Sequence, residues 1–181
     1  MRPTCANLLA LVLSASIVVG ACGDERDLAH DHAHSHEHSH EDMQSEPGQG
    51  IVIEACAHAA SGPFAEVNAA AEAKDAPSAN FPHTALHINL VEEGADSGQY
   101  TGYVSYEAGA TSGFHVFLSA DLPFTIFDAS DSAVPLNESV SIDTCSELRR
   151  HHRVDLNGGV YTLWFGPTSD VAVTLVVEQA W

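Results

Sequence analysis

Basic residues are scarce in this chain of 181 residues: six Lys and Arg face 25 Asp and Glu, which gives a formal net charge of −19. Nucleic-acid binding requires a basic patch that neutralises phosphates, so the composition argues against a nucleic-acid partner. The GxSxG, HExxH, P-loop and dinucleotide-binding motifs are also missing. We therefore expect a protein that is not an enzyme, and an unknown hydrolase is the third of three hypotheses.

Long apolar runs are confined to the N-terminus. Arg2 precedes a stretch from Leu8 to Val19 that is apolar apart from small residues, which is typical of a secretory signal peptide. The stretch is too short and too weakly flanked to predict a transmembrane span. It ends in Val19-Gly20-Ala21-Cys22, which resembles the lipobox of bacterial lipoproteins.

The lipobox resemblance implies that residues 1–21 are removed and that Cys22 carries acyl chains. Two or more chains would anchor the protein stably to the lipid bilayer of the bacterial cell envelope. Gly23 after the cysteine favours the outer membrane, while Asp24 leaves a periplasm-facing anchor in the inner membrane open. An ordinary signal peptide followed by a chance cysteine is the alternative.

Cysteine is scarce too, with four residues. If Cys5 leaves with the signal peptide and Cys22 is acylated, Cys56 and Cys145 remain as an even pair in an oxidising compartment. We predict a disulfide between these two. The alternative is that both are thiolate metal ligands, but no CxxC spacing supports it.

Histidine is abundant by contrast, since its 12 residues are twice the number of Lys and Arg. Half of them lie in the segment 22–50, which has no hydrophobic periodicity and which we predict to be a disordered, acidic tether. They occupy every second position of a tract that consists of His30, His32, His34, His36, His38 and His40 with the residues between them.

Alternate imidazoles on an extended chain leave the same side about 6–7 Å apart, so two or three of them can ligate one cation. Zn²⁺ fits best, and Cu²⁺ and Ni²⁺ are chemically competitive. The tract resembles the His-rich loops of bacterial zinc-uptake proteins, which implies metal capture or buffering. The alternatives are a solvated spacer and a purification tag, but interleaved acids and the position after the lipobox argue against a tag.

Residues 51–181 show the period-two alternation of β-strands. Tyr161, Leu163 and Phe165 share one face of a predicted strand, and Leu86 and Ile88 share one face of another. Residues 64–74 are the one segment that we consider as an alternative helix. The predicted strands cover residues 51–56, 64–70, 83–90, 99–107, 113–120, 123–128, 148–155, 159–165 and 170–178.

These short strands predict an all-β fold, a single antiparallel β-sandwich. Asn157-Gly158 predicts a hairpin that joins the last two long strands. The run from Val154 to Phe165, followed by the strand at Val171, resembles the end of pre-peptidase C-terminal-like sandwich domains, which implies a jelly-roll-type accessory module. Cys56-Ala57-His58, Gly62-Pro63 and Cys145 after a His-rich leader resemble small bacterial lipoproteins without an established activity.

A second metal site inside the sandwich is also possible. His83 and His87 share a strand face but lie about 13 Å apart, so any site must combine strands. The predicted disulfide would draw His58 towards the segment that holds His151 and His152, so His58, one of these two, and His83 or His87 are candidate ligands. His115 alternates with apolar residues and is interpreted as structural. The alternative is that all of them are ordinary surface or carboxylate-paired histidines.

The first hypothesis is therefore a membrane-anchored lipoprotein that binds or buffers a divalent transition metal through its tether. It would serve metal uptake or homeostasis and would present the ion to the sandwich or to a metal transporter. The second hypothesis is a non-catalytic adhesion or envelope-structure module in which the His tract is only a spacer.

Overall fold

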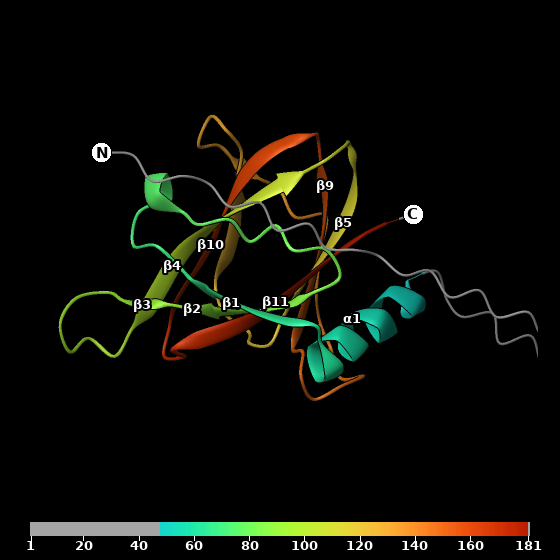
Figure 1. Ribbon diagram of the computed structural model, residues 1–181, viewed down its shortest axis with the longest axis horizontal. Helices are drawn as coiled ribbons and strands as arrows, with labels where there is room; N and C mark the ends of the chain where they lie inside the picture. Colours follow the sequence, from blue (N-terminus) through green and yellow to red (C-terminus); the bar gives the residue numbers. More distant parts are fainter. Residues whose placement is uncertain (1–47, 181) are drawn as a thin grey trace, which may run out of the picture. The chain divides into compact units, whose positions relative to one another are not determined.

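The computed structural model describes residues 48–180, which form two β-sheets packed face to face and one helix (Figure 1). The predicted all-β sandwich is confirmed. The predicted signal peptide, Cys22 and the six histidines of the tract lie outside the described residues. Within residues 48–180, no helix is long and apolar enough to cross a membrane.

The larger sheet has six strands in the order β1-β2-β11-β5-β9-β8, and the smaller has five in the order β3-β4-β10-β6-β7. The strands of the larger sheet are β1 (Phe64–Asn68), β2 (Ala85–Asn89), β5 (Ser112–Leu118), β8 (Glu138–Ser141), β9 (Arg150–Leu156) and β11 (Ala172–Gln179). Those of the smaller sheet are β3 (Val91–Glu92), β4 (Tyr100–Ala108), β6 (Phe124–Phe127), β7 (Ala133–Val134) and β10 (Gly159–Thr168).

The main hydrophobic core lies between the two sheets and follows the predicted alternation. Tyr161, Leu163 and Phe165 of β10 are buried in it, and they face Leu86 and Ile88 of β2 across the sandwich. Each large apolar side chain buried in this way stabilises the fold by about 1.5–3 kcal/mol. This core orders the larger sheet, whose opposite face is the one that carries the candidate site.

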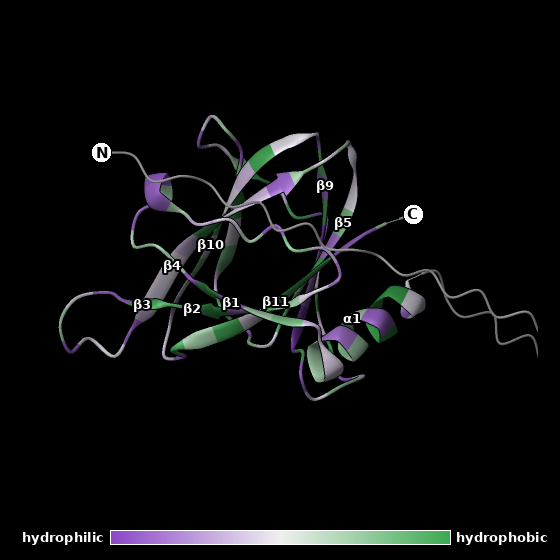
Figure 2. Cartoon of the chain, in the orientation of Figure 1, coloured by the Kyte–Doolittle hydropathy of each residue, from purple (hydrophilic) through white to green (hydrophobic). Residues whose placement is uncertain are grey.

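The strand predicted at 51–56 is wrong, because this segment belongs to α1 (Gln49–Ser61). The β-branched run Ile51-Val52-Ile53 favours a strand locally, but apolar residues recur at helical spacing from Ile51 to Ala59. These residues pack on a second core cluster on the outer face of the larger sheet, around Phe117 and Val176. Figure 2 shows the resulting mixture of hydrophobic and hydrophilic residues along α1.

The predicted Asn157-Gly158 hairpin is also wrong. A tight turn does lie there, but β9 before it pairs with β5 and β8, while β10 after it pairs with β4 and β6. The chain therefore crosses from one sheet to the other. The Tyr161 hydroxyl fastens this corner, because it donates to the Asn157 carbonyl and accepts from the Asn157 N–H, each at 3.0 Å.

The sandwich is not antiparallel throughout, since β1 and β2 run parallel. The connection between them leaves the larger sheet, passes through a short 3₁₀ helix, η1 (Ala73–Asp75), and forms bridges from Ala70 to Tyr103 and from Ser78 to Ser105 in the smaller sheet. The segment 64–74, considered above as an alternative helix, forms β1 and then the start of η1. The crossover returns to β2 through His83, and this path brings His83 to the end of α1.

Candidate metal centre

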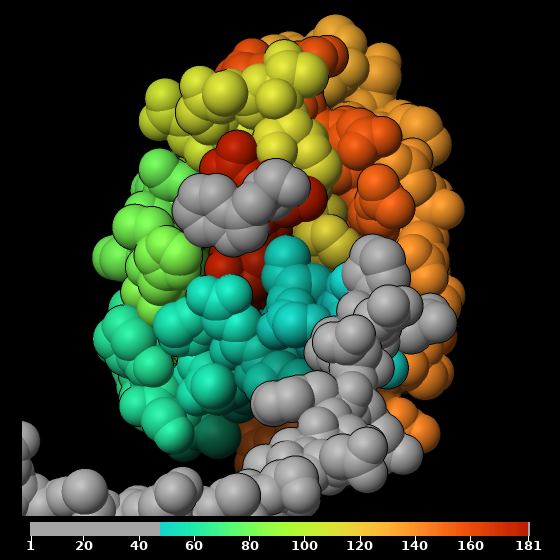
Figure 3. Space-filling model, turned by 90° about the vertical axis from the view of Figure 1, so that its right-hand side faces the viewer, coloured from blue at the N-terminus to red at the C-terminus, as the bar shows by residue number. Residues whose placement is uncertain are grey.

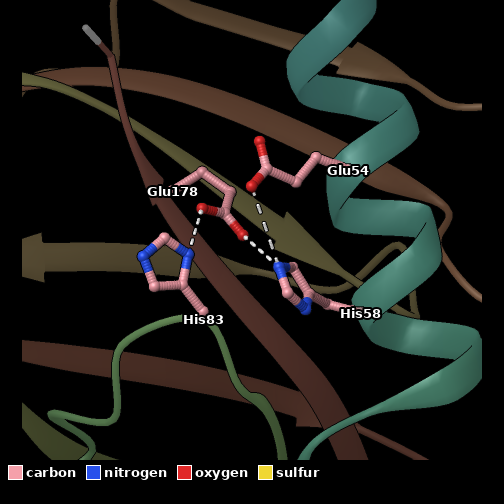
Figure 4. Close-up of side chains that lie close together, drawn as sticks. All are labelled: Glu54, His58, His83 and Glu178. Carbon is pink, nitrogen blue, oxygen red and sulfur yellow. Dashed lines mark ion pairs between the residues drawn. The ribbon is translucent and has the colours of Figure 1, made fainter. Parts of the chain in front are cut away.

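Four side chains with metal-binding atoms gather where α1 meets the outer face of the larger sheet (Figure 4). Glu54 and His58 come from α1, His83 from the loop before β2, and Glu178 from β11. One ligand atom from each lies within 4.8 Å of all the others. Figure 3 shows the surrounding face of the molecule, with α1 in cyan beside β11 in red.

His58 is the centre of the group. Its Nε2 atom lies 3.6 Å from Glu178 Oε1 and 3.9 Å from Glu54 Oε1, while His83 Nδ1 lies 3.7 Å from Glu178 Oε2. Glu54 and His58 reach the same point because residues four apart lie on one side of a helix. In an extended chain these two residues would have been about 13 Å apart.

The orientation of the His58 ring is set by the end of the helix. Gly62 ends α1 with a positive φ of 77°, and its N–H donates to the His58 carbonyl at 2.8 Å. A Cβ at this position would lie 2.8 Å from the Phe64 ring, so glycine is required there. The Gly62 carbonyl in turn lies 3.5 Å from His58 Nδ1. In the neutral tautomer that carries its proton on Nδ1, the ring donates to that carbonyl, and Nε2 keeps a lone pair directed at the carboxylates.

Glu178 is the buried member of the group, with only 5% of the residue exposed. Burial, and after it the neighbouring Glu54 carboxylate, raise the pKa of Glu178, while His58 and His83 act in the opposite direction. No group among residues 48–180 donates a hydrogen bond to its Oε1 atom. A buried carboxylate oxygen without a donor is costly, and either a proton or a cation between the carboxylate and the imidazoles would offset that cost.

His83 is the most exposed member, ahead of Glu54, and its backbone is strained. It has a φ of 50°, a left-handed conformation that is uncommon outside glycine, and it is 55% exposed at the side chain. Two anchors hold it: the buried Ala79 donates to the Ser105 carbonyl at 2.8 Å, and Ala85 donates to the Pro63 carbonyl at 2.9 Å. Such strain persists where the surroundings enforce it, often at a ligand site.

The donor set consists of two imidazole nitrogens and two carboxylate oxygens. In a tetrahedral site with bonds of about 2.0–2.1 Å, neighbouring ligand atoms lie about 3.3–3.4 Å apart. Three of the separations found here, 3.6–3.9 Å, exceed this by a few tenths of an ångström, and all four ligand atoms lie within 4.8 Å of one another, so side-chain rotations would have to close the set around an ion. Two imidazoles favour Zn²⁺ or a neighbouring transition metal over Ca²⁺ and Mg²⁺, which prefer oxygen ligands only.

The other histidines predicted as ligands lie elsewhere. His87 Nδ1 lies 3.2 Å from Thr174 Oγ1, and its ring stacks on Phe64. His152 points into the sandwich, where it stacks on Phe124 and neither ring nitrogen has a hydrogen-bond partner among the described residues. Burial first, and then the Arg150 charge, lower the pKa of His152 to about 4.

His151 pairs with His115 rather than with His58. The two rings are nearly parallel, with Nδ1 of His115 2.8 Å from Nε2 of His151, and Phe117 stacks on His151. One ring donates this hydrogen bond and the other accepts it, so neither of these nitrogens is free for a metal. Burial is the largest cause that lowers the pKa of both imidazoles. His115 is the register partner of Glu178, so the pair borders the site without joining it.

The structure thus brings together His58 and His83 from the predicted set and adds two glutamates that sequence reasoning missed. Glu54 was missed because its segment was predicted as a strand. Glu178 had a detectable signal, since it follows Val176 at a spacing of two and therefore shares its face of β11. No helix was predicted to cover that face.

The predicted disulfide is confirmed: Cys56 of α1 is bonded to Cys145 in the loop after β8, with the Cα atoms 6.1 Å apart. It lies beside the metal-binding group, two residues from both Glu54 and His58.

No protein-family model matches the chain, and no curated protein matches it with significant similarity. The chemistry inferred for this centre therefore depends on the geometry of its own residues.

Proposed function

We propose that this protein binds a divalent transition-metal cation, Zn²⁺ first, in a folded site formed by Glu54, His58, His83 and Glu178. One observation carries the proposal: the buried Glu178 carboxylate has an oxygen without a hydrogen-bond donor and faces His58 Nε2 at 3.6 Å. Either a proton or a metal cation must lie between them. A metal cation satisfies both glutamates and both histidines at once, whereas one proton on His58 satisfies only one contact.

In this proposal the folded site is the second of two metal-binding elements. The His tract at residues 30–40 captures or buffers the ion, and the lipid on Cys22 holds the chain at the bacterial envelope. The folded site then retains the ion or presents it to a metal transporter. The abundance of histidine and the acidic charge of −19, which attracts cations, support this role.

The test is calorimetric titration with Zn²⁺. The purified chain carries serine in place of all six tract histidines, and this variant is called the tract-serine background. The measured heat then comes only from Zn²⁺ binding to folded sites. We expect one Zn²⁺ per chain and an affinity that falls about a hundredfold or more in His58→Ala, because even the loss of groups that only orient ligands costs about 10–100-fold.

The matched control is His87→Ala, which removes a half-buried histidine of the same sheet that lies outside the group. It should bind Zn²⁺ as the background does. Binding no tighter than millimolar in the background, or equal losses in His58→Ala and His87→Ala, would refute the folded site.

A further inference from the structure

The disulfide and the proposed site share one helix. Cys56 lies between Glu54 and His58, so the covalent bond to Cys145 holds the turn of α1 that supplies half of the ligand set. The other two ligands, His83 and Glu178, come from the loop before β2 and from β11, outside α1. Loosening of α1 would therefore displace two of the four ligands.

The remaining anchorage of α1 is modest. The helix has 13 residues, no side-chain cap at its N-terminus and no acidic residue in its first turn. Helices of this length are marginal in water without tertiary contacts. Its packing depends on the small buried Ala55 and on partly buried neighbours such as Ile51 and Val52, while Ile53 is 60% exposed. The disulfide is thus a major restraint on the position of Glu54 and His58.

We propose that the Cys56–Cys145 disulfide is a redox control of metal affinity, so that the oxidised protein holds the cation and reduction releases it. This inference rests on the proposed function. Both cysteines are only partly buried, so a reductant can reach them. In the envelope a protein dithiol would supply the two electrons: the S–S bond breaks, two thiols form, and the dithiol becomes a disulfide. Freed from the sheet, α1 no longer holds His58 Nε2 opposite Glu178.

The coupling must be reciprocal. If oxidation raises the affinity for the metal by some factor, the bound metal stabilises the disulfide against reduction by the same factor. For a two-electron couple, each tenfold change in affinity corresponds to about 30 mV in the reduction potential. We expect a tenfold or larger effect, because loss of α1 removes two ligands.

The first experiment measures Zn²⁺ affinity in the tract-serine background with and without Cys56→Ala and Cys145→Ala together. The double substitution removes the bridge without leaving thiols that ligate Zn²⁺ themselves. We expect the affinity to fall tenfold or more. Circular dichroism checks that the β-sandwich persists. Equal affinity with and without the bridge would overturn the redox proposal while leaving the metal site intact, whereas no binding by the bridged background would refute the site itself.

The second experiment needs no cysteine substitution. The bridged tract-serine background is treated with a water-soluble phosphine, which with one water converts the disulfide to two thiols and becomes a phosphine oxide. Thiols at Cys56 and Cys145 are trapped by alkylation and followed by mass spectrometry. Saturating Zn²⁺ should slow their appearance and Mg²⁺ should not. In His58→Ala, Zn²⁺ should lose its effect. The same reduction rate with and without Zn²⁺ in the unmodified site would contradict the proposal.

Discussion

The two faces of the six-stranded sheet differ in what they bury. The inner face packs apolar side chains such as Phe114, Val154 and Leu175 against the smaller sheet. The outer face, under α1, combines a small apolar cluster with Glu178, His115 and His151. Both faces are formed by the same strands, with successive residues alternating between them. The comparison teaches that stability is concentrated on one face and titratable chemistry on the other, with His152 as the exception.

The largest expected effect is in the core between the sheets, against which the inner face packs. Phe165→Ala removes a side chain that is fully buried between the sheets, so it should lower the free energy of unfolding by about 4 kcal/mol. Denaturant unfolding of the tract-serine background measures this. If the faces are separate in function, the Zn²⁺ affinity of the molecules that remain folded is unchanged. A large loss of affinity in the folded fraction would show that the division between faces is wrong.

His152 tests the exception. Its pKa is lowered in the folded state to about 4 from 6.5, so its neutral form contributes stability that is fully present above about pH 6.5 and is lost as the pH falls towards 4. The shift corresponds to about 3 kcal/mol. Unfolding free energies measured between pH 7 and 4 should fall by about that much more in the unmodified protein than in His152→Leu. Parallel pH profiles would show that this imidazole is not buried as described.

Substitution of Glu178 should have a smaller effect on stability. It should stabilise the metal-free protein and weaken metal binding. Glu178→Gln removes a buried charge whose pKa is raised by burial, so metal-free protein at pH 7 should gain about 1 kcal/mol. As the pH falls below the raised pKa the carboxyl of the unmodified protein becomes protonated, and this advantage of the variant disappears. Thermal unfolding with a chelator measures the gain. With Zn²⁺ present the unmodified protein should become the more stable of the two.

The smallest effect is expected at the border of the site. His115→Asn breaks the hydrogen bond to His151 and leaves all four proposed ligands in place. We expect a loss of stability of about 1 kcal/mol and no more than a fewfold change in Zn²⁺ affinity. Calorimetry and denaturant unfolding of the same preparation measure both. A hundredfold loss of affinity would extend the metal centre to the imidazole pair.

Alternating apolar residues sufficed to predict the sandwich and much of its core, because burial on one face of a strand imposes a period of two on the sequence. The disulfide was predictable by elimination among four cysteines. The site was only half predictable. His58 and His83 were candidates because imidazole is a chemically distinctive metal ligand. Glu54 was one of 25 acidic residues, and only a helical conformation brings it to His58.

Local sequence also misled at the Asn157-Gly158 turn. The dipeptide specifies a tight reversal, but it does not specify whether the strands on either side pair or separate into two sheets. That choice depends on which neighbours bury the strands best. β5 and β8 flank β9, and β4 and β6 flank β10, so both strands already have two hydrogen-bonded partners each.

Composition and periodicity by themselves determined the acidic character, the abundance of imidazole, the strand-rich fold and the cysteine pair, since each follows from residue type or from alternation along the chain. Only the tertiary structure decided that residues 49–61 form a helix, that the helix covers the outer face of the larger sheet, and that Glu178 is buried beneath it. The physical reason is that a metal centre is a set of distances, and its four side chains come from parts of the chain that lie up to 124 residues apart and meet only when the sheet and helix have packed.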